Sequence, residues 1–222
     1  MKIVVPGEKI KILNKEDLKN YKVINCFIKE KNKKFEVYSK FWGILNEKKR
    51  EKTIEIIPIN GKYLPAIGDF VIGKVKEVLP NMWIIDINSP FLATLLLKDA
   101  LNERVDFEKT DLSKFYDIND LVFGKIEGIT RNKTIRISLK SSSQKKLDNG
   151  LLVEINNILN YWLIQNKEKI REKLKKKKIE IIIGKNRLIW IKGKKEILSK
   201  LVKILKNMER TMNFDLSAFE KL

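Results

Sequence analysis

Between residues 61 and 140 the chain carries a series of short apolar segments, separated by Gly, Pro and Asn, that constrains its fold more than any other feature. Most of these segments alternate apolar with polar residues and are rich in β-branched side chains, which is typical of strands. They lie at 70–78, 82–87, 91–97, 121–129 and 134–139. Five strands are the number in a small closed Greek-key barrel. The insertion at 98–120 is long enough for one or two helical turns.

The segments on either side of this barrel predict two further domains. An N-terminal β domain is expected over residues 1–58, the barrel over 59–140, and a C-terminal α/β domain over 147–222. The fold class is therefore multidomain, mainly β with an α+β part. Residues 141–146 are polar and are expected to form a linker.

In the N-terminal domain, strands are predicted at 21–28, 35–45 and 53–58, with a polar hairpin tip at 29–34. A domain this small buries little surface alone and is expected to pack against a partner. The apolar pair Phe41 and Trp42 is expected in the core, and a docking surface for a partner is the alternative.

In the C-terminal domain, strands are predicted first and the helical segments are placed between and after them. The strands lie at 151–155, 179–183 and 188–192, the Lys-dominated stretch 167–177 is compatible with a helix, and 194–210 has the apolar spacing of an amphipathic helix.

The charge of the chain indicates a polyanionic partner. Its 222 residues include 47 Lys or Arg and 28 Asp or Glu, a net charge of +19. The net charge is +7 over residues 1–58, +1 over 59–140 and +11 over 141–222. Such a balance favours nucleic acid first and an anionic membrane second. Because 40 of the basic residues are Lys, we expect binding to the backbone more than reading of bases. A general bias of the genome toward Lys is the alternative explanation.

The composition also limits which catalytic and metal sites the chain can contain. There is no histidine, so Ser/His and Cys/His pairs are excluded, and neither a catalytic site, a metal site nor a cofactor is expected. The enzyme alternative is a metal-dependent nuclease using the carboxylates of Asp99, Asp106, Asp111, Asp117 and Asp120. Asp111 is interpreted instead as a helix cap, and Asp117 and Asp120 as turn residues. One cysteine, Cys26, fits a reducing cytoplasm, and neither a membrane span nor a signal peptide is expected.

Strand parity predicts which barrel residues face outward, because successive side chains point to opposite faces. RNA crosses the second and third strands of such barrels and the adjoining loops. Trp83 shares the parity of the core, and Phe91 is a candidate for base stacking or, alternatively, for core packing. The candidate RNA-binding residues of the barrel are Lys74, Lys76, Phe91, Lys125 and Arg136, with Arg131 and Lys133 in the last turn.

Several stretches resemble a known family. GDFVIGKV at 68–75, WIIDI at 83–87 and RISL at 136–139 resemble an S1-type RNA-binding domain, which is an oligonucleotide-binding (OB) barrel. VVPGE at 4–8 resembles the start of the archaeal exosome cap subunits that carry an S1 and a KH domain. IIIGKNRLIWIKG at 181–193 resembles the closing strand pair of their KH domain. The matches occur in family order in all three parts of the chain.

The resemblance implies a non-catalytic, RNA-binding cap component of the exosome. Three copies, alone or mixed with the other type of cap subunit, would sit through the N-terminal domain on a hexameric ring of 3′–5′ exoribonuclease subunits. There they would recruit RNA, preferably poly(A)-rich, for degradation. The alternatives are a translation- or ribosome-associated RNA-binding protein, and a purely structural clamp on the ring.

The chain departs from the KH pattern at one position. A KH domain holds the nucleotide backbone with a GxxG loop, and the corresponding residues here, 165–168, read QNKE. Both glycines are absent and Glu168 adds a negative charge, so we expect the loop not to act as a clamp. RNA contacts are instead predicted at Lys175, Lys176 and Lys177, for which a solvated helix end is the alternative.

Overall fold

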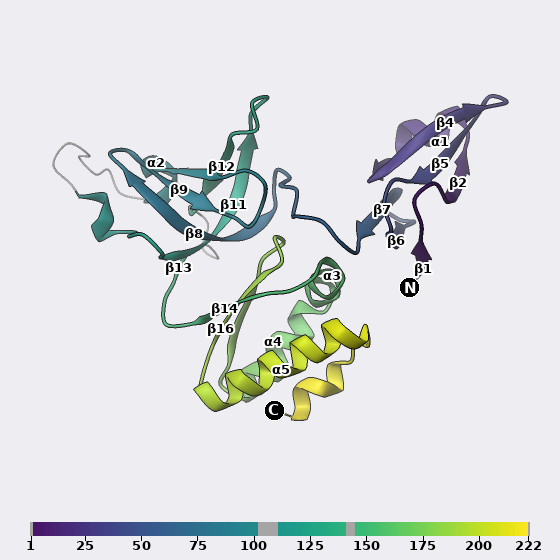
Figure 1. The fold of residues 1–222 in the computed structure, drawn as a ribbon. Helices are drawn as coiled ribbons and strands as arrows, with labels where there is room; N and C mark the ends of the chain where they lie inside the picture. The colour runs from purple at the N-terminus through teal and green to yellow at the C-terminus, as the bar shows by residue number, and fades with distance from the viewer. Residues whose placement is uncertain (1, 102–110, 141–144, 222) are drawn as a thin grey trace. The chain divides into compact units, whose positions relative to one another are not determined.

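The computed structural model describes residues 2–101, 111–140 and 145–221 (Figure 1). Contacts divide the chain into two units. The N-terminal unit comprises Met1–Gly61 with Asn156–Ile158, and the main unit comprises Lys62–Ile155 with Leu159–Leu222. Over the described ranges, every helix is too short or too polar to cross a membrane.

The N-terminal unit contains two small sheets. One has the strand order β1-β6-β7-β3 and the other β2-β5-β4. The strands are β1 (Lys2–Val4), β2 (Lys9–Leu13), β3 (Lys22–Ile24), β4 (Cys26–Lys31), β5 (Lys34–Ser39), β6 (Gly43–Lys48) and β7 (Thr53–Pro58). The short helix α1 (Lys15–Asn20) begins after Asn14, whose Oδ1 accepts from the Asp17 N–H at 2.6 Å. The buried core of the N-terminal unit is formed by Leu13, Val37 and Ile54.

Three expectations for this unit are corrected and one is confirmed. The single strand predicted at 21–28 forms β3 and β4, and the single strand predicted at 35–45 forms β5 and β6; the members of each pair belong to different sheets. Phe41 and Trp42 connect β5 and β6 and are 42% and 53% exposed, so the expectation that they lie in the core is wrong. The hairpin tip is confirmed, because β4 pairs with β5 around Asn32 and Lys33, both at positive φ (51° and 60°).

The main unit begins with the predicted five-stranded barrel. β8 (Phe70–Leu79), β9 (Met82–Asp86), β10 (Ala93–Leu96), β11 (Leu121–Ile129) and β12 (Ile135–Ser138) pair in the order β12-β10-β9-β8-β11, and β12 also pairs with β11. The last pairing closes the barrel, as in an OB fold. The third strand is shorter than predicted, because Leu97–Ala100 form the helix α2 and Phe91 lies in the loop before β10.

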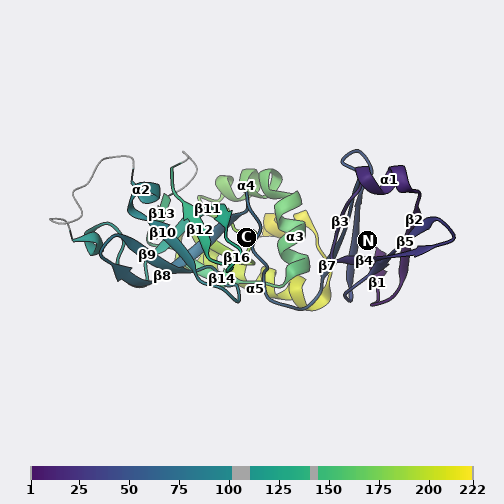
Figure 2. The ribbon, with the colours of Figure 1, turned by 90° about the horizontal axis from the view of Figure 1, so that it is seen from above.

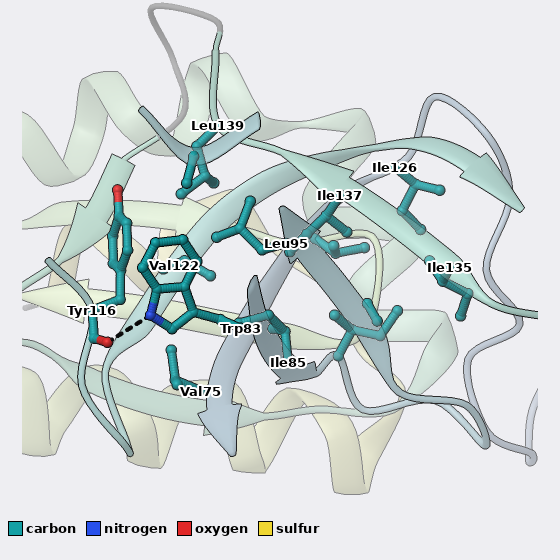
Figure 3. Close-up of a cluster of buried hydrophobic side chains, with 14 of the residues drawn as sticks. Val75, Trp83, Ile85, Leu95, Tyr116, Val122, Ile126, Ile135, Ile137 and Leu139 are labelled. Carbon is teal, nitrogen blue, oxygen red and sulfur yellow. Dashed lines mark hydrogen bonds between the residues drawn. The ribbon is translucent and has the colours of Figure 1, made fainter. Parts of the chain in front are cut away.

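The barrel core follows the predicted parity. Trp83 is fully buried, its Nε1 donates to the carbonyl oxygen of Tyr116 at 2.8 Å, and the two rings meet edge to face with centroids 5.2 Å apart (Figure 3). Around them pack Val75, Ile85, Leu95, Val122, Ile126, Ile135, Ile137 and Leu139. Trp83 is therefore a core residue, as the sequence predicts.

The predicted linker is partly a strand. Lys145–Leu147 form β13, which pairs antiparallel with the start of β11. The remainder of that prediction, residues 141–144, lies outside the described residues. β13 thereby extends the barrel sheet. Its apolar Leu147 side chain is buried on the sheet, which stabilises the pairing, and its Lys145 side chain is exposed.

The C-terminal part of the main unit is a three-stranded sheet with helices, which we call the KH-like domain (Figure 2). Its elements are β14 (Leu151–Glu154), α3 (Asn157–Gln165), α4 (Lys167–Lys176), β15 (Glu180–Ile183), β16 (Leu188–Lys192), α5 (Lys195–Thr211) and the 3-10 helix η2 (Leu216–Lys221), with the strand order β14-β16-β15. The helices pack on one sheet face through an apolar core centred on Leu163, Ile170, Ile189 and Leu205. The succession of elements is that of a KH domain.

The other face of this sheet packs against the barrel. Six buried side chains from both parts form one cluster, which we call the junction cluster: Ile72, Phe123, Leu147, Ile182, Leu188 and Trp190. Beside it, the buried Asn186 donates from Nδ2 to the carbonyl oxygens of Ile72 (2.6 Å) and Ile87 (2.8 Å), and its Oδ1 accepts from the Ile72 N–H (3.1 Å). Gly184 leaves room for this amide, because a Cβ there would lie 2.3 Å from Oδ1 of Asn186.

Candidate nucleic-acid interface

One edge of the barrel brings together an aromatic ring and basic residues predicted to bind RNA. Phe91 is half-buried against the barrel core, and the Lys133 ammonium lies 4.8 Å from its ring centroid. Lys133 and the exposed Arg131 belong to the β11–β12 turn, which is closed by hydrogen bonds between Thr130 and Thr134 and has Lys133 at φ 61°. Arg136 follows on β12, in register with Thr94 of β10. We call Phe91, Arg131, Lys133 and Arg136 the barrel edge.

Asp99 determines the electrostatics near Arg136. Its Oδ2 lies 3.7 Å from Nε of Arg136, is buried, and accepts no hydrogen bond from any residue that the structure describes. The carbonyl oxygen of Asp99 accepts from the Leu139 N–H at 2.7 Å, which fixes α2 against the residue that follows β12. The Arg136 side chain is 49% exposed, so a phosphate can still approach it.

Three other candidates lie elsewhere on the barrel. Lys74 and Lys125 stand on β8 and β11, on the outer face that also carries Ile72 and Phe123. That face packs on the KH-like domain, so both lysines flank the junction cluster. Lys125 pairs with Glu127 at 3.3 Å. Lys76 is the bulged residue between Val75 and Glu77 and pairs with Asp86 at 3.6 Å.

The lysine run at 175–178 ends α4. Lys175 and Lys176 are exposed, Lys177 is partly buried, and Lys178 leaves the helix at φ 58°. Lys175 also lines a groove of about 480 Å³ together with Arg171, Lys145 and Phe123. The structure thus places these lysines on a different element from the barrel edge. Lys145, which the sequence analysis assigned to a linker, joins this basic groove through β13.

The position of the GxxG loop is a single residue between two helices. α3 ends at Gln165, Asn166 has φ −110° and ψ 14°, and α4 begins at Lys167. The Asn166 N–H donates to the carbonyl oxygens of Trp162 (3.1 Å) and Leu163 (3.2 Å), so it is not free for a phosphate. Glu168 lies 3.7 Å from both Lys167 and Arg171. This geometry supports the prediction that the loop is not a backbone clamp.

Two variants distinguish the contribution of the loop to RNA binding from that of the lysine run. Asn166→Ala with Lys167→Ala is expected to bind single-stranded RNA almost as wild type, because the loop amide is already engaged in the helix junction. Replacing Lys175, Lys176 and Lys177 with alanine is expected to weaken RNA binding. The slope of log K against log salt should flatten by about two, because each phosphate contact contributes roughly 0.7 to it. Filter binding across a salt series measures both. A loop variant that binds more weakly than the lysine variant contradicts this.

The carboxylates of the nuclease alternative have structural partners. Asp111 accepts from the N–H (3.0 Å) and the hydroxyl (2.7 Å) of Ser113, the predicted cap, and these hydrogen bonds lower its pKa. Asp120 accepts from the Asp117 N–H in the predicted turn and pairs with Lys146 at 2.5 Å, which raises the pKa of Lys146. Asp106 lies outside the described residues. Across the ranges that are described, no three Asp, Glu, Cys or His side chains gather as a metal site would require.

A closed five-stranded barrel with a basic edge, packed on a KH-like sheet, defines an S1-type barrel protein with a C-terminal KH-like domain. The family profile named RRP4, S1 domain, matches residues 62–128. A crystal structure provisionally described as an exosome complex RNA-binding protein superposes with a TM-score of 0.60 at 22% identity, covering 67% of this chain and 86% of the other. That likeness shows the shared fold.

Curated relatives give the family. The chain is 32% identical to the exosome complex component Rrp4 of Picrophilus torridus, covering 94% of this chain and 85% of the relative. It is 34% identical to the protein of that name from Methanothermus fervidus, covering 94% and 87%. The match to the Pyrococcus horikoshii relative, at 36% identity, covers 74% of this chain and 63% of the relative. The chain therefore belongs to the archaeal Rrp4 family of exosome complex components.

Proposed function

We propose that this protein is a non-catalytic, RNA-binding cap component of an archaeal exosome, which recruits RNA to a 3′–5′ exoribonuclease ring. Membership of the Rrp4 family supports this, since its curated relatives are named as exosome complex components. The family resemblance further suggests three copies on a hexameric ring, alone or with the other cap subunit type, and a preference for poly(A)-rich RNA. None of these relatives is named as a translation- or ribosome-associated protein, so that alternative is not favoured.

The barrel edge is the observation that carries the proposal. The Lys133 ammonium lies over the Phe91 ring, and the side chain of Arg136 on β12 is half exposed. These cations suit the phosphates of a strand that crosses β9 and β10. Contacts of this kind are independent of sequence, and a charged surface at the entrance to a ring raises the local concentration of RNA.

Purification followed by crosslinking tests the proposal. The protein expressed at native levels should co-purify with exoribonuclease ring subunits, and ultraviolet crosslinking of the complex should join RNA to the peptide that contains Phe91 or Arg136. Co-purification with ribosomes alone would overturn it. A stable ring complex without RNA crosslinks would instead support the structural clamp.

The protein alone is expected not to shorten RNA. The described acidic residues of the nuclease alternative are engaged in a cap, a turn and ion pairs. End-labelled RNA, incubated with phosphate and Mg²⁺, should remain at full length over hours. Shortening that disappears in Asp111→Ala or Asp117→Ala would show that this assignment is wrong.

The N-terminal unit is proposed as the ring anchor, with Phe41 and Trp42 as its contact. Phe41→Ser with Trp42→Ser is expected to abolish co-elution with ring subunits while leaving the melting temperature within about 2 °C of wild type, because surface changes alter stability little. Leu64→Ser with Ile67→Ser removes comparably exposed apolar side chains from the main unit and is the matched control. Full retention of the first variant in the complex would refute the anchor.

We also propose a cytoplasmic location. The only cysteine, Cys26, has its thiol pKa raised to about 11 by burial, so it is a poor nucleophile for disulfide exchange. A chain of this kind fits a reducing compartment, as the sequence analysis expects.

A further inference from the structure

The loop between β9 and β10 connects the barrel edge to the KH-like domain. Within this loop, Asn88 donates from Nδ2 to Oε1 of Glu154 at 3.1 Å and to the carbonyl oxygen of Asn186 at 3.3 Å. Asn88 adopts φ 55°, and its N–H donates to Oδ1 of Asp86 at 2.9 Å. The same loop carries Phe91, against whose ring the Lys133 ammonium lies. Only Ser89 and Pro90 separate Asn88 from Phe91.

Glu154 is itself held in place by its own domain. Nη2 of Arg187 donates to the same Oε1 atom at 2.8 Å, and the Arg187 side chain is 15% exposed. Nζ of Lys206 on α5 donates to the carbonyl oxygen of Glu154 at 2.8 Å. The Glu154 side chain is 55% exposed, but Arg187 holds its carboxylate where Oε1 can accept from Asn88 at the end of β14.

The loop between Asn88 and Phe91 is stiff, so the placement of Asn88 determines that of the Phe91 ring. The Ser89 hydroxyl accepts from the Phe91 N–H at 3.1 Å and donates to the Phe91 carbonyl oxygen, which closes a tight turn. Proline fixes its own φ and restricts the residue before it, so the loop has few conformations to adopt. A shift of Asn88 would therefore move the ring on which Lys133 rests.

We propose that Glu154 is a positioning residue for RNA binding by the barrel: it holds Asn88 and thereby sets Phe91 and Lys133 where they meet the RNA. The inference rests on the proposed function of the barrel edge. It assigns to the KH-like domain a role in RNA binding that needs no clamp at residues 165–168. This role is carried by one hydrogen-bonded carboxylate that acts on the neighbouring barrel.

Charge-matched variants of the full chain test this. Glu154→Ala is expected to weaken binding of a labelled oligoadenylate of about 12 nucleotides by about threefold, the scale of one exposed cation–π contact. Glu180→Ala is the control, because it removes the same charge from another carboxylate, which pairs with Lys145 of the barrel at 2.6 Å. Glu154→Gln retains an acceptor for Asn88 and should bind as wild type. Binding by Glu154→Ala equal to that of Glu180→Ala would overturn the inference.

A double-mutant cycle adds a readout that a general loss of stability would not produce. If Glu154 acts through the loop, Glu154→Ala should change affinity no further once Phe91→Ala is present. Additive effects would overturn the positioning role while leaving the barrel edge intact. Unchanged binding by Phe91→Ala alone would instead remove that residue from the barrel edge, on which the inference depends.

Discussion

Replacing Asn186 with alanine is expected to lower the free energy of unfolding by about 3 kcal/mol, a large effect for a single polar side chain. Its amide makes three hydrogen bonds to backbone groups of Ile72 and Ile87 and is fully buried. β8 and β9 pair only from Lys74 and Asp86 onward, so the amide occupies the place where the ladder between them stops. Alanine would leave those backbone groups buried without partners.

Thermal unfolding measures this effect. For a unit of this size a loss of 3 kcal/mol corresponds to a fall of about 9 °C in melting temperature. Asn207→Ala, at an exposed position of α5, is the matched control and should change it by less than about 2 °C. Similar melting temperatures for the two variants would show that the interdomain amide contributes little.

Alanine at Arg131, Lys133 and Arg136 together is expected to produce the largest loss of RNA affinity. Each phosphate contact contributes about 0.7 to the slope of log K against log salt for a single strand, so the slope should flatten by about two units. The measurement is binding of single-stranded RNA to the assembled complex over a salt series. An unchanged slope would refute the assignment.

A second triple variant separates a defined edge from diffuse attraction. Lys195, Lys200 and Lys203 are exposed on α5, and their replacement by alanine removes the same charge. The slope should then change by much less than two units. Equal flattening by both variants would show that the net charge of +19, rather than the barrel edge, governs binding.

The barrel was predictable because its pattern is local. Alternation along β8 and β9 places Val71, Val75, Trp83 and Ile85 inside, and each of these side chains is fully buried. The N-terminal unit was harder, since no Pro and no Asn-Gly pair within residues 35–45 marks where one strand ends and the next begins. Its two strands separate at Ser39, whose hydroxyl donates to the carbonyl oxygen of Phe41 and whose N–H donates to that of Glu8. The contact with Glu8 depends on a distant chain segment, which periodicity does not reveal.

The candidate site was predicted only in part. Strand parity tells whether a side chain points into the barrel core or outward, but it does not tell which outer side of the barrel the side chain occupies. It grouped Lys74, Lys125 and Arg136 as outward residues, and all three do point away from the barrel core. Which outer side each occupies depends on the packing of the KH-like domain, which covers the face beside Lys74 and Lys125. Asp99 was considered only as a metal ligand, and its pairing with Arg136 joins residues 37 positions apart.

The junction cluster has a consequence for how the main unit opens. Ile72 and Phe123 come from the barrel, Ile182 and Trp190 from the KH-like sheet, and all four are buried in one cluster. Neither part can separate from the other without exposing this surface to water, so we expect them to open together in hydrogen exchange. Amide protons of β8 and β16 are then expected to share one opening free energy, whereas two independently opening domains would give two.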